Sequence, residues 1–222
     1  MDFIPSSYAL RPPWRLYPPR RLIRFHGMSL SDHLQQQFLD SIAAQELALE
    51  VLVEPIALAV TRMVQCLMHD GKILVCGNGA SAAHAQLFAS ALVNRFEAER
   101  PALAAIALSA DAAVLSAIAA DTDYARVFAR QVEALGAPGD LLLAITASGN
   151  SRSVLEAVTT AQDKDMGVIA LTGRDGGDLA DALREEDILL SAPGENRARI
   201  REVHLLTLHC LCEGIDYSLL GA

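Results

Sequence analysis

The chain has 222 residues, a length that suits a single domain, and it carries a net charge of −9 at pH 7. An acidic body of this kind argues against direct binding of nucleic acid through a basic face. No apolar run approaches the roughly 20 residues of a membrane-spanning helix, so we expect no membrane partner. The 4 cysteines show no CxxC spacing, which favours reduced thiols and a cytoplasmic protein.

Residues 1–27 differ in composition from the rest of the chain. They hold five of the nine prolines, and five arginines against a single acid. They lack the apolar stretch of about seven residues that a secretory signal requires. We expect a disordered extension here and a folded domain over residues 28–222. A basic arm for nucleic acid, or a true start at Met28, are the alternatives.

Two amphipathic helices are predicted over residues 30–70. Ser31 can cap the first helix, whose apolar positions recur every fourth residue, at Leu34, Phe38 and Ile42. The second helix is expected to begin near Pro55, because proline suits the first turn of a helix. Its apolar stripe comprises Ile56, Val60, Met63 and Leu67. Because this helix pair stands outside the pattern of the remaining chain, we expect it to make subunit contacts.

Over residues 72–220, short apolar runs alternate with helical patterns. This alternation predicts an α/β core with a parallel sheet that is covered by helices on both faces. Five strands are expected, at Ile73–Cys76, Ala104–Leu108, Leu141–Thr146, Gly167–Leu171 and Ile188–Leu190. The helices are expected near residues 81–96, 111–119, 124–135, 151–164 and 195–219.

Two loops of small residues follow two of these apolar runs. The first reads Cys76-Gly77-Asn78-Gly79-Ala80-Ser81, and the second reads Thr146-Ala147-Ser148-Gly149-Asn150-Ser151. A strand that ends in such residues and then opens a helix leaves backbone N–H groups free at the helix N-terminus. With hydroxyl groups added, this geometry can hold a phosphate without lysine or arginine. Two such loops predict one anionic ligand that is bound from two sides.

These loops have two other interpretations. Residues 77–82 fit the dinucleotide pattern GxGxxA, but the acid that should follow about 20 residues later is not in place. The nearest equivalent, Asp111, lies 32 residues after Gly79. The second loop could also be ordinary helix capping by Ser148 or Ser151.

The ordered set of motifs is similar to that of the sugar isomerase (SIS) domain superfamily. The motifs are VCGNGxS, IALS, GDLLLAITASGNS, VIALTGRDGG and RIREVHLLTLHCLC, within residues 30–220. Within that superfamily the chain resembles the phosphoheptose isomerase subgroup, and most closely the proteins that associate with the replication initiator DnaA. The resemblance implies a flavodoxin-like five-stranded parallel sheet, a homotetramer and a sugar-phosphate cleft between subunits.

The resemblance also implies roles for particular residues. Sugar contacts fall on Asn78, Gly79, Ala80 and Asp121, with Ser81 nearby. Phosphate contacts fall on Thr146, Ala147, Ser148 and Ser151. Phosphoheptose isomerases carry a His and a Glu four residues apart on an early helix, and a Gln and a His eight apart on the last helix. Such groups can hold a divalent metal and transfer a proton.

This chain departs from the isomerase set at three of those four positions. Leu87 and Ala91 stand where the His and Glu are expected, and Arg201 stands at the Gln position, so that only His209 remains. Leucine and alanine neither bind metal nor transfer protons, and an arginine repels a cation. A rearranged site that uses His84, His204 and His209 is a further alternative, although the last two do not share a helix face.

We therefore expect a non-catalytic sugar-phosphate-binding scaffold, with no cofactor, that associates with DnaA and regulates the initiation of replication. A tetramer would offer several copies of one acidic surface to such a partner. The alternative is a phosphoheptose isomerase that acts on sedoheptulose 7-phosphate, with zinc, for heptose synthesis. A third hypothesis is a regulator that senses a sugar phosphate.

Overall fold

The computed structural model describes residues 29–221, so the extension expected over residues 1–27 lies outside the described residues. The chain divides into two units between Gln37 and Phe38. Of the first unit, the structure describes Ser29 and the first turns of helix α1, which spans Leu30–Met68. Ser29 and Asp32 cap this helix reciprocally, each accepting the other's backbone N–H at 3.0–3.1 Å. The cap is therefore Ser29 and not the predicted Ser31.

The predicted pair of N-terminal helices is wrong in one respect, because α1 is a single continuous helix with Pro55 in its interior. A proline removes one backbone hydrogen bond, here the bond to the Val51 carbonyl, and usually breaks or kinks a helix. Val51 lies on the exposed side of the helix, where water can satisfy the freed carbonyl. Apolar burial of Leu52, Ala59 and Val60 on the opposite side holds the helix together across the proline.

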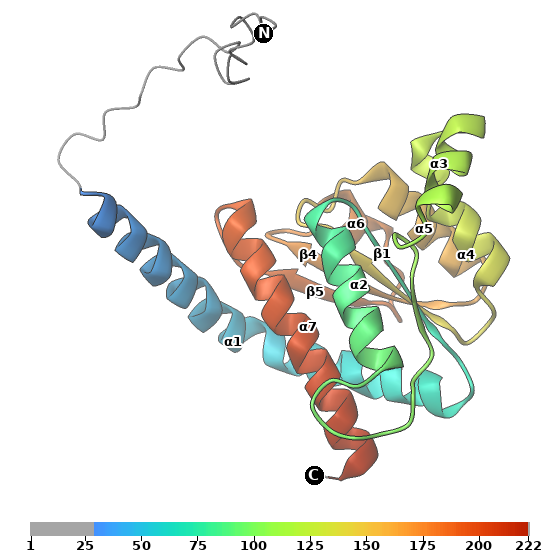
Figure 1. Cartoon of the computed structure of the whole chain (residues 1–222), viewed down its shortest axis with the longest axis horizontal. Helices are drawn as coiled ribbons and strands as arrows, with labels where there is room; N and C mark the ends of the chain where they lie inside the picture. The colour runs from blue at the N-terminus through green and yellow to red at the C-terminus, as the bar shows by residue number, and fades with distance from the viewer. Residues whose placement is uncertain (1–28, 222) are drawn as a thin grey trace, which may run out of the picture. The chain divides into compact units, whose positions relative to one another are not determined.

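The prediction of a five-stranded parallel sheet is confirmed (Figure 1). The strands are β1 (Ile73–Gly77), β2 (Ala105–Ala107), β3 (Leu141–Ile145), β4 (Gly167–Gly173) and β5 (Ile188–Ala192). All four strand pairs are parallel, and the spatial order is β2-β1-β3-β4-β5. This is the flavodoxin-like order, in which the chain turns back between β1 and β3.

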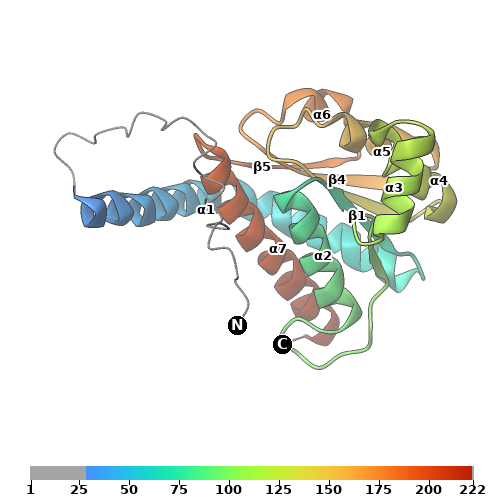
Figure 2. The same ribbon diagram turned by 45° about the horizontal axis from the view of Figure 1, so that its top comes forward.

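Helices cover both faces of the sheet, as Figure 2 shows. Helices α2 (Ala80–Val93) and α7 (Arg197–Leu220) lie side by side on one face, together with residues of α1 that follow Gln37. The other face carries α3 (Ala112–Asp121), the 3₁₀ turn η2 (Tyr124–Arg126), α4 (Ala129–Leu135), α5 (Arg152–Asp163) and α6 (Gly177–Ala182). The short helix α6 was not predicted, since it begins at a glycine and has too few residues to show periodicity.

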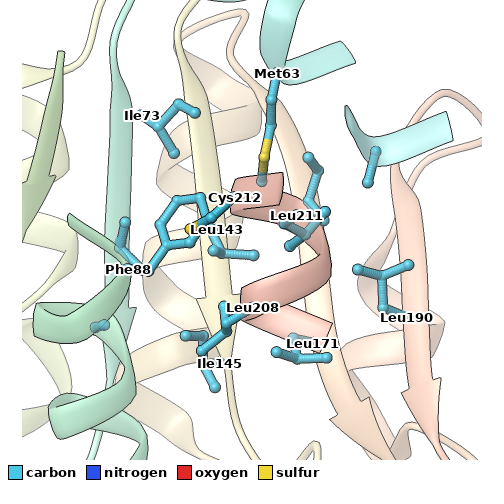
Figure 3. Packing of buried hydrophobic residues seen from close by; sticks show 14 of the residues in the cluster. Met63, Ile73, Phe88, Leu143, Ile145, Leu171, Leu190, Leu208, Leu211 and Cys212 are labelled. Carbon is cyan, nitrogen blue, oxygen red and sulfur yellow. The ribbon is translucent and has the colours of Figure 1, made fainter. Parts of the chain in front are cut away.

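Alternate residues of each central strand enter two separate cores. Ile73 and Val75 of β1 pack in one cluster with Phe88, Leu143 and Leu208, which Figure 3 shows in part. Their neighbours along the strand enter the second cluster, beneath α4 and α5. This period of two, with apolar residues on both faces, is what a sheet covered by helices requires. No helix within residues 29–221 is long and apolar enough to cross a membrane.

Candidate anion-binding cleft

A small cleft of about 190 Å³ opens where β1 and β3 end. This is the point at which the strand order reverses, and ligands of open α/β sheets bind at such points. Parallel strands bring the loops that follow them to the same edge, so both small-residue loops meet here. The residues that line the cleft are Asn78, Ser81, Ile145, Thr146, Ala147, Ser148, Ser151, Arg197 and Arg201.

The first loop is held close to the end of β3 by glycine. A side chain at Gly77 would lie 2.8–2.9 Å from Ser81 and from the Ile145 carbonyl oxygen, closer than real contacts allow. Gly79 has a φ of 58° and precedes the first residue of α2, a backbone conformation that suits glycine. Ser81 is 5% exposed, and its side chain forms no hydrogen bond with another residue of the described chain. Its hydroxyl is therefore available to a ligand.

Asn78 joins the two loops through its side-chain amide. The Nδ2 group donates to the hydroxyls of Ser151 and Ser153, both at 2.8 Å. The Tyr124 hydroxyl donates to Asn78 Oδ1 at 2.8 Å. Two of these bonds reach the start of α5 and the third reaches η2, so Asn78 fixes the β1 loop against both elements.

The second loop is hydrogen-bonded to the first turn of α6. Gly149 has a φ of 72° and its carbonyl accepts the Leu179 N–H at 3.0 Å. Asn150 Oδ1 accepts the backbone N–H of Asp178 at 2.9 Å. The Asn150 N–H in turn donates to Ser148 Oγ at 3.3 Å. These bonds set the positions of the hydroxyl groups before any ligand is bound.

Ser151 precedes the first residue of α5, yet its hydroxyl caps no backbone N–H of that helix. It instead accepts a hydrogen bond from Asn78. The alternative that Ser151 serves as an ordinary cap is therefore wrong. The N-terminus of α5 keeps its partial positive charge without a capping side chain, which favours an anion.

Two arginines that the sequence analysis did not assign to binding also line the cleft. Arg197 and Arg201 lie four residues apart on α7 and so share one face of the helix. Neither forms an ion pair with any residue that the structure describes. Their spacing of four residues in the sequence is the signal that could have predicted this pair.

The structure brings most of the predicted site residues together. Those that line the cleft are Asn78, Ser81, Thr146, Ala147, Ser148 and Ser151. Gly79 and Ala80 lie between two lining residues, at the start of α2. Asp121 is an exposed residue at the end of α3 and is not part of the cleft lining. The ligand contacts assigned to these residues remain predictions.

The side chains at the four positions of the isomerase set do not fit the metal ion that the resemblance implies for isomerases. Leu87 and Ala91 are half-buried on α2, where Ala91 packs against the core. His209 contacts Phe96, with ring centroids 5.5 Å apart. Within residues 29–221, no group of three or more His, Cys, Asp and Glu side chains could hold a metal ion. The chemistry of the cleft must therefore be derived from other groups.

Two histidines lie between α2 and α7. The rings of His84 and His204 are 6.4 Å apart and nearly edge to face. His204 is fully buried, and its Nε2 lies 2.7 Å from the Thr172 carbonyl oxygen, to which it donates. Burial, with a smaller effect of the nearby charges of His84 and Arg201, lowers the pKa of His204 to about 4, against the opposing effect of the hydrogen bond to Thr172. Burial, with the charges of Arg201 and His209, also lowers the pKa of His84.

The depressed pKa of His204 makes stability depend on pH in a defined direction. The unfolded chain binds this proton below pH 6.5, whereas the folded chain does not until about pH 4. The lowered pKa therefore contributes about 3 kcal/mol to the free energy of unfolding above pH 6.5. This contribution is lost as the pH falls from 6.5 toward 4. Urea unfolding across this range should show the loss. In His204→Gln, whose amide can still donate to Thr172, the loss should be smaller; an equal loss in both proteins would contradict the assignment.

The strand order and the two loops that end β1 and β3 define a flavodoxin-like α/β protein with a cleft at the point where the strand order reverses. Residues 37–173 match the SIS domain family, and the chain belongs to that family. Within it, the chain belongs to the phosphoheptose isomerase subgroup. It is 55% identical over 194 residues to the phosphoheptose isomerase of Laribacter hongkongensis, covering 87% of this chain and 99% of that protein.

Other relatives support the same subgroup. The phosphoheptose isomerase of Aromatoleum aromaticum is 56% identical, over 87% of this chain and 98% of its own length. The structure of the phosphoheptose isomerase from Neisseria gonorrhoeae superposes with a TM-score of 0.81 at 48% identity, over 85% of this chain and 99% of that one. The enzyme from Francisella tularensis gives 0.83 at 46% identity, with the same two coverages.

These relatives correct the expected function. The prediction of a non-catalytic scaffold that associates with DnaA is wrong, since relatives more than half identical over nearly their whole length are named phosphoheptose isomerases. That prediction relied on the side chains at Leu87, Ala91 and Arg201. Replacement of these three side chains does not by itself distinguish a lost reaction from one carried out by other groups.

Proposed function

We propose that the chain is a phosphoheptose isomerase that holds the phosphate of its substrate in the cleft between β1 and β3. The observation that carries this proposal is the convergence of two small-residue loops with Arg197 and Arg201 around one cleft. The names of the relatives support the substrate class. The reaction would interconvert sedoheptulose 7-phosphate, a ketose, with an aldose phosphate.

Phosphate recognition is divided between neutral and charged groups. The hydroxyls of Thr146, Ser148 and Ser151 lie at one wall, beside the N-terminus of α5. Hydroxyls and backbone N–H groups hold phosphate oxygens with directed hydrogen bonds. The arginines of α7 add two permanent positive charges, which suit a phosphate monoester of nearly two negative charges.

Removal of two hydroxyls tests the phosphate contact. The double variant Ser148→Ala, Ser151→Ala should weaken sedoheptulose 7-phosphate binding at least about tenfold, because each charge-assisted hydrogen bond is worth roughly 1.5–3 kcal/mol. Calorimetric titration measures the affinity. The matched control, Ser116→Ala with Thr159→Ala, removes two exposed hydroxyls of α3 and α5 outside the cleft and should leave it unchanged. Equal affinity of wild type and the cleft variant would exclude this site.

Turnover tests the reaction itself. An enzyme of ordinary rate converts on the order of one substrate molecule per second or more, and the aldose product can be followed directly. Binding without any conversion would contradict the isomerase proposal and leave a phosphosugar-binding protein.

We further propose that the protein is a homotetramer, assembled in part through α1. Several apolar side chains of this helix are exposed, among them Leu34, Phe38 and Ile42, which are 51–74% accessible. The cleft of about 190 Å³ is smaller than the 300 Å³ or more of most ligand pockets, which supports a contribution from a second copy. We propose no nucleic-acid, membrane or cofactor partner.

Charged substitutions test this assembly. Phe38→Asp with Ile42→Asp should reduce the mass in solution, measured by light scattering, because burying two carboxylates in an apolar contact costs several kcal/mol. The control Gln35→Asp with Gln45→Asp adds the same charge at exposed polar positions of the helix and should keep the wild-type mass. A wild-type monomer would refute the proposal directly.

A further inference from the structure

Tyr124 is not among the residues that line the cleft, yet its hydroxyl begins a chain of hydrogen bonds that ends on one of them. The Tyr124 hydroxyl donates to Asn78 Oδ1 at 2.8 Å. The Nδ2 group of the same amide donates to Ser151 Oγ, also at 2.8 Å, and Ser151 lines the cleft. No other group in the described part of the chain donates to Asn78 Oδ1, so this side of the amide depends on the tyrosine.

We infer that Tyr124 is a positioning residue for the phosphate of the substrate, and that it acts through Asn78 and the Ser151 hydroxyl without touching the ligand. The inference rests on the proposed function, because it requires a phosphate in the cleft. It adds to the site a residue that belongs neither to the two loops nor to the arginines of α7. What Tyr124 controls is the direction in which one hydroxyl donates its hydrogen.

The Ser151 hydroxyl must donate to a phosphate, because the phosphate oxygens are acceptors. A serine hydroxyl has one hydrogen and two acceptor positions. Asn78 Nδ2 fills one acceptor position of Ser151 Oγ, and Ser153 Oγ lies 3.4 Å from the same atom, where it can donate to the second. Ser151 Oγ has no other hydrogen-bond partner within residues 29–221. Its hydrogen is therefore left for a ligand in the cleft.

The orientation of the Asn78 amide decides this outcome. Its second N–H donates at 2.8 Å to Ser153, which is 3% exposed, so both amide hydrogens face the start of α5 and Oδ1 faces η2. In the reverse orientation, Oδ1 would accept the serine hydrogens and remove the donor that the phosphate needs. Donation by Tyr124 to Oδ1 stabilises the first orientation, and hydrogen bonds aligned along one chain strengthen one another.

The turn η2 is fastened to α5 on both sides of its tyrosine. Before it, a carboxylate oxygen of Asp123 lies 3.4 Å from Nη1 of Arg152, in the first turn of α5. After it, Nη1 of Arg126 lies 3.5 Å from a carboxylate oxygen of Glu156, one turn further along α5. Single pairs of this kind contribute little to stability. Together they hold the tyrosine beside the helix that Ser151 precedes, before a ligand is bound.

Removal of the phenol hydroxyl tests the role of the tyrosine. In full-length Tyr124→Phe, calorimetric titration should show about fivefold weaker binding of inorganic phosphate and of sedoheptulose 7-phosphate, as expected for the loss of one neutral hydrogen bond. In turnover, KM should rise by the same factor with kcat within about twofold, because the phosphate is held equally in the ground and transition states. The control Tyr217→Phe removes the hydroxyl of a tyrosine on α7 that is 67% exposed and outside the cleft lining, and it should change neither quantity.

A double-mutant cycle shows whether the tyrosine acts through the serine. Ser151→Ala alone should weaken phosphate binding about tenfold or more. When Tyr124→Phe is added to Ser151→Ala, the affinity should change by less than about twofold, because no hydroxyl remains to be oriented. A tyrosine that contacted the ligand directly, or that only stabilised the fold, would show its full fivefold effect in both backgrounds.

Two results would overturn the inference. One is equal phosphate affinity of Tyr124→Phe and the wild type, and the other is a fivefold loss that persists in the Ser151→Ala background. In both cases the proposed function stands if the wild type converts sedoheptulose 7-phosphate. A wild type that binds neither inorganic phosphate nor sedoheptulose 7-phosphate would remove the proposed phosphate site, and the inference with it.

Discussion

Substitution of Gly149 by alanine is expected to abolish phosphate binding, with an affinity at least about 100-fold lower than that of the wild type. A Cβ atom at this position would overlap the backbone oxygen of Gly176 and lie 2.9 Å from the Gly177 Cα atom. Both are main-chain atoms, which cannot rotate away as a flexible side chain can. The loop must therefore move, and Ser148 and Ser151 on either side of it lose their positions in the cleft.

A control substitution separates this collision from simple backbone strain. Gly139 also has a positive φ, 87°, but a Cβ atom added there would meet nothing within 4 Å. Gly139→Ala should therefore cost only the left-handed strain of about 1–2 kcal/mol and leave ligand affinity unchanged. Gly149→Ala should cost more in the free energy of unfolding and should also lose affinity. Similar unfolding curves and affinities for the two variants would contradict the packing argument.

Much of the fold follows directly from the pattern of apolar residues. The five strands begin and end within two residues of the predicted runs, because a strand buried on both faces must be apolar at every position. The loop positions of the cleft were predictable for a related reason. Small residues between a strand and a helix let the backbone turn sharply at the end of the strand, so Asn78 and Ser148 fall at the sheet edge.

The parts that were missed depend on contacts distant in sequence. Pro55 predicts a helix start from local rules, yet burial of its neighbours carries α1 through it. Arg197 and Arg201 follow an exposed helix start, where arginines are ordinary, and only the approach of α7 to the β3 loop gives them a role. The non-catalytic interpretation failed for a different reason, since it relied on Leu87, Ala91 and Arg201 alone, whereas relatives more than half identical over nearly their whole length are named phosphoheptose isomerases.

A second large effect is expected at the opposite end of the α2–α7 pair. Arg100 and Asp216 are 1% and 5% exposed, and Nε of the arginine lies 2.5 Å from a carboxylate oxygen of the aspartate. The same guanidinium donates to the carbonyls of Ala91 and Leu92 at 2.8 and 2.9 Å, in the last turn of α2. This one side chain therefore connects the end of α2 to α7.

Asp216→Ala should lower the free energy of unfolding by about 3–5 kcal/mol, because it leaves the Arg100 cation buried without its counter-charge. Denaturant unfolding, followed by circular dichroism, measures the loss. The control Glu99→Ala removes the partner of Arg95 in an ion pair whose side chains are 47% and 85% exposed, and it should cost less than about 1 kcal/mol. Near-equal stability of the two variants would show that the buried pair is not the connection proposed. If the Arg100–Asp216 pair does connect α2 to α7, Asp216→Ala should also weaken phosphate binding, since α7 carries Arg201 to the cleft.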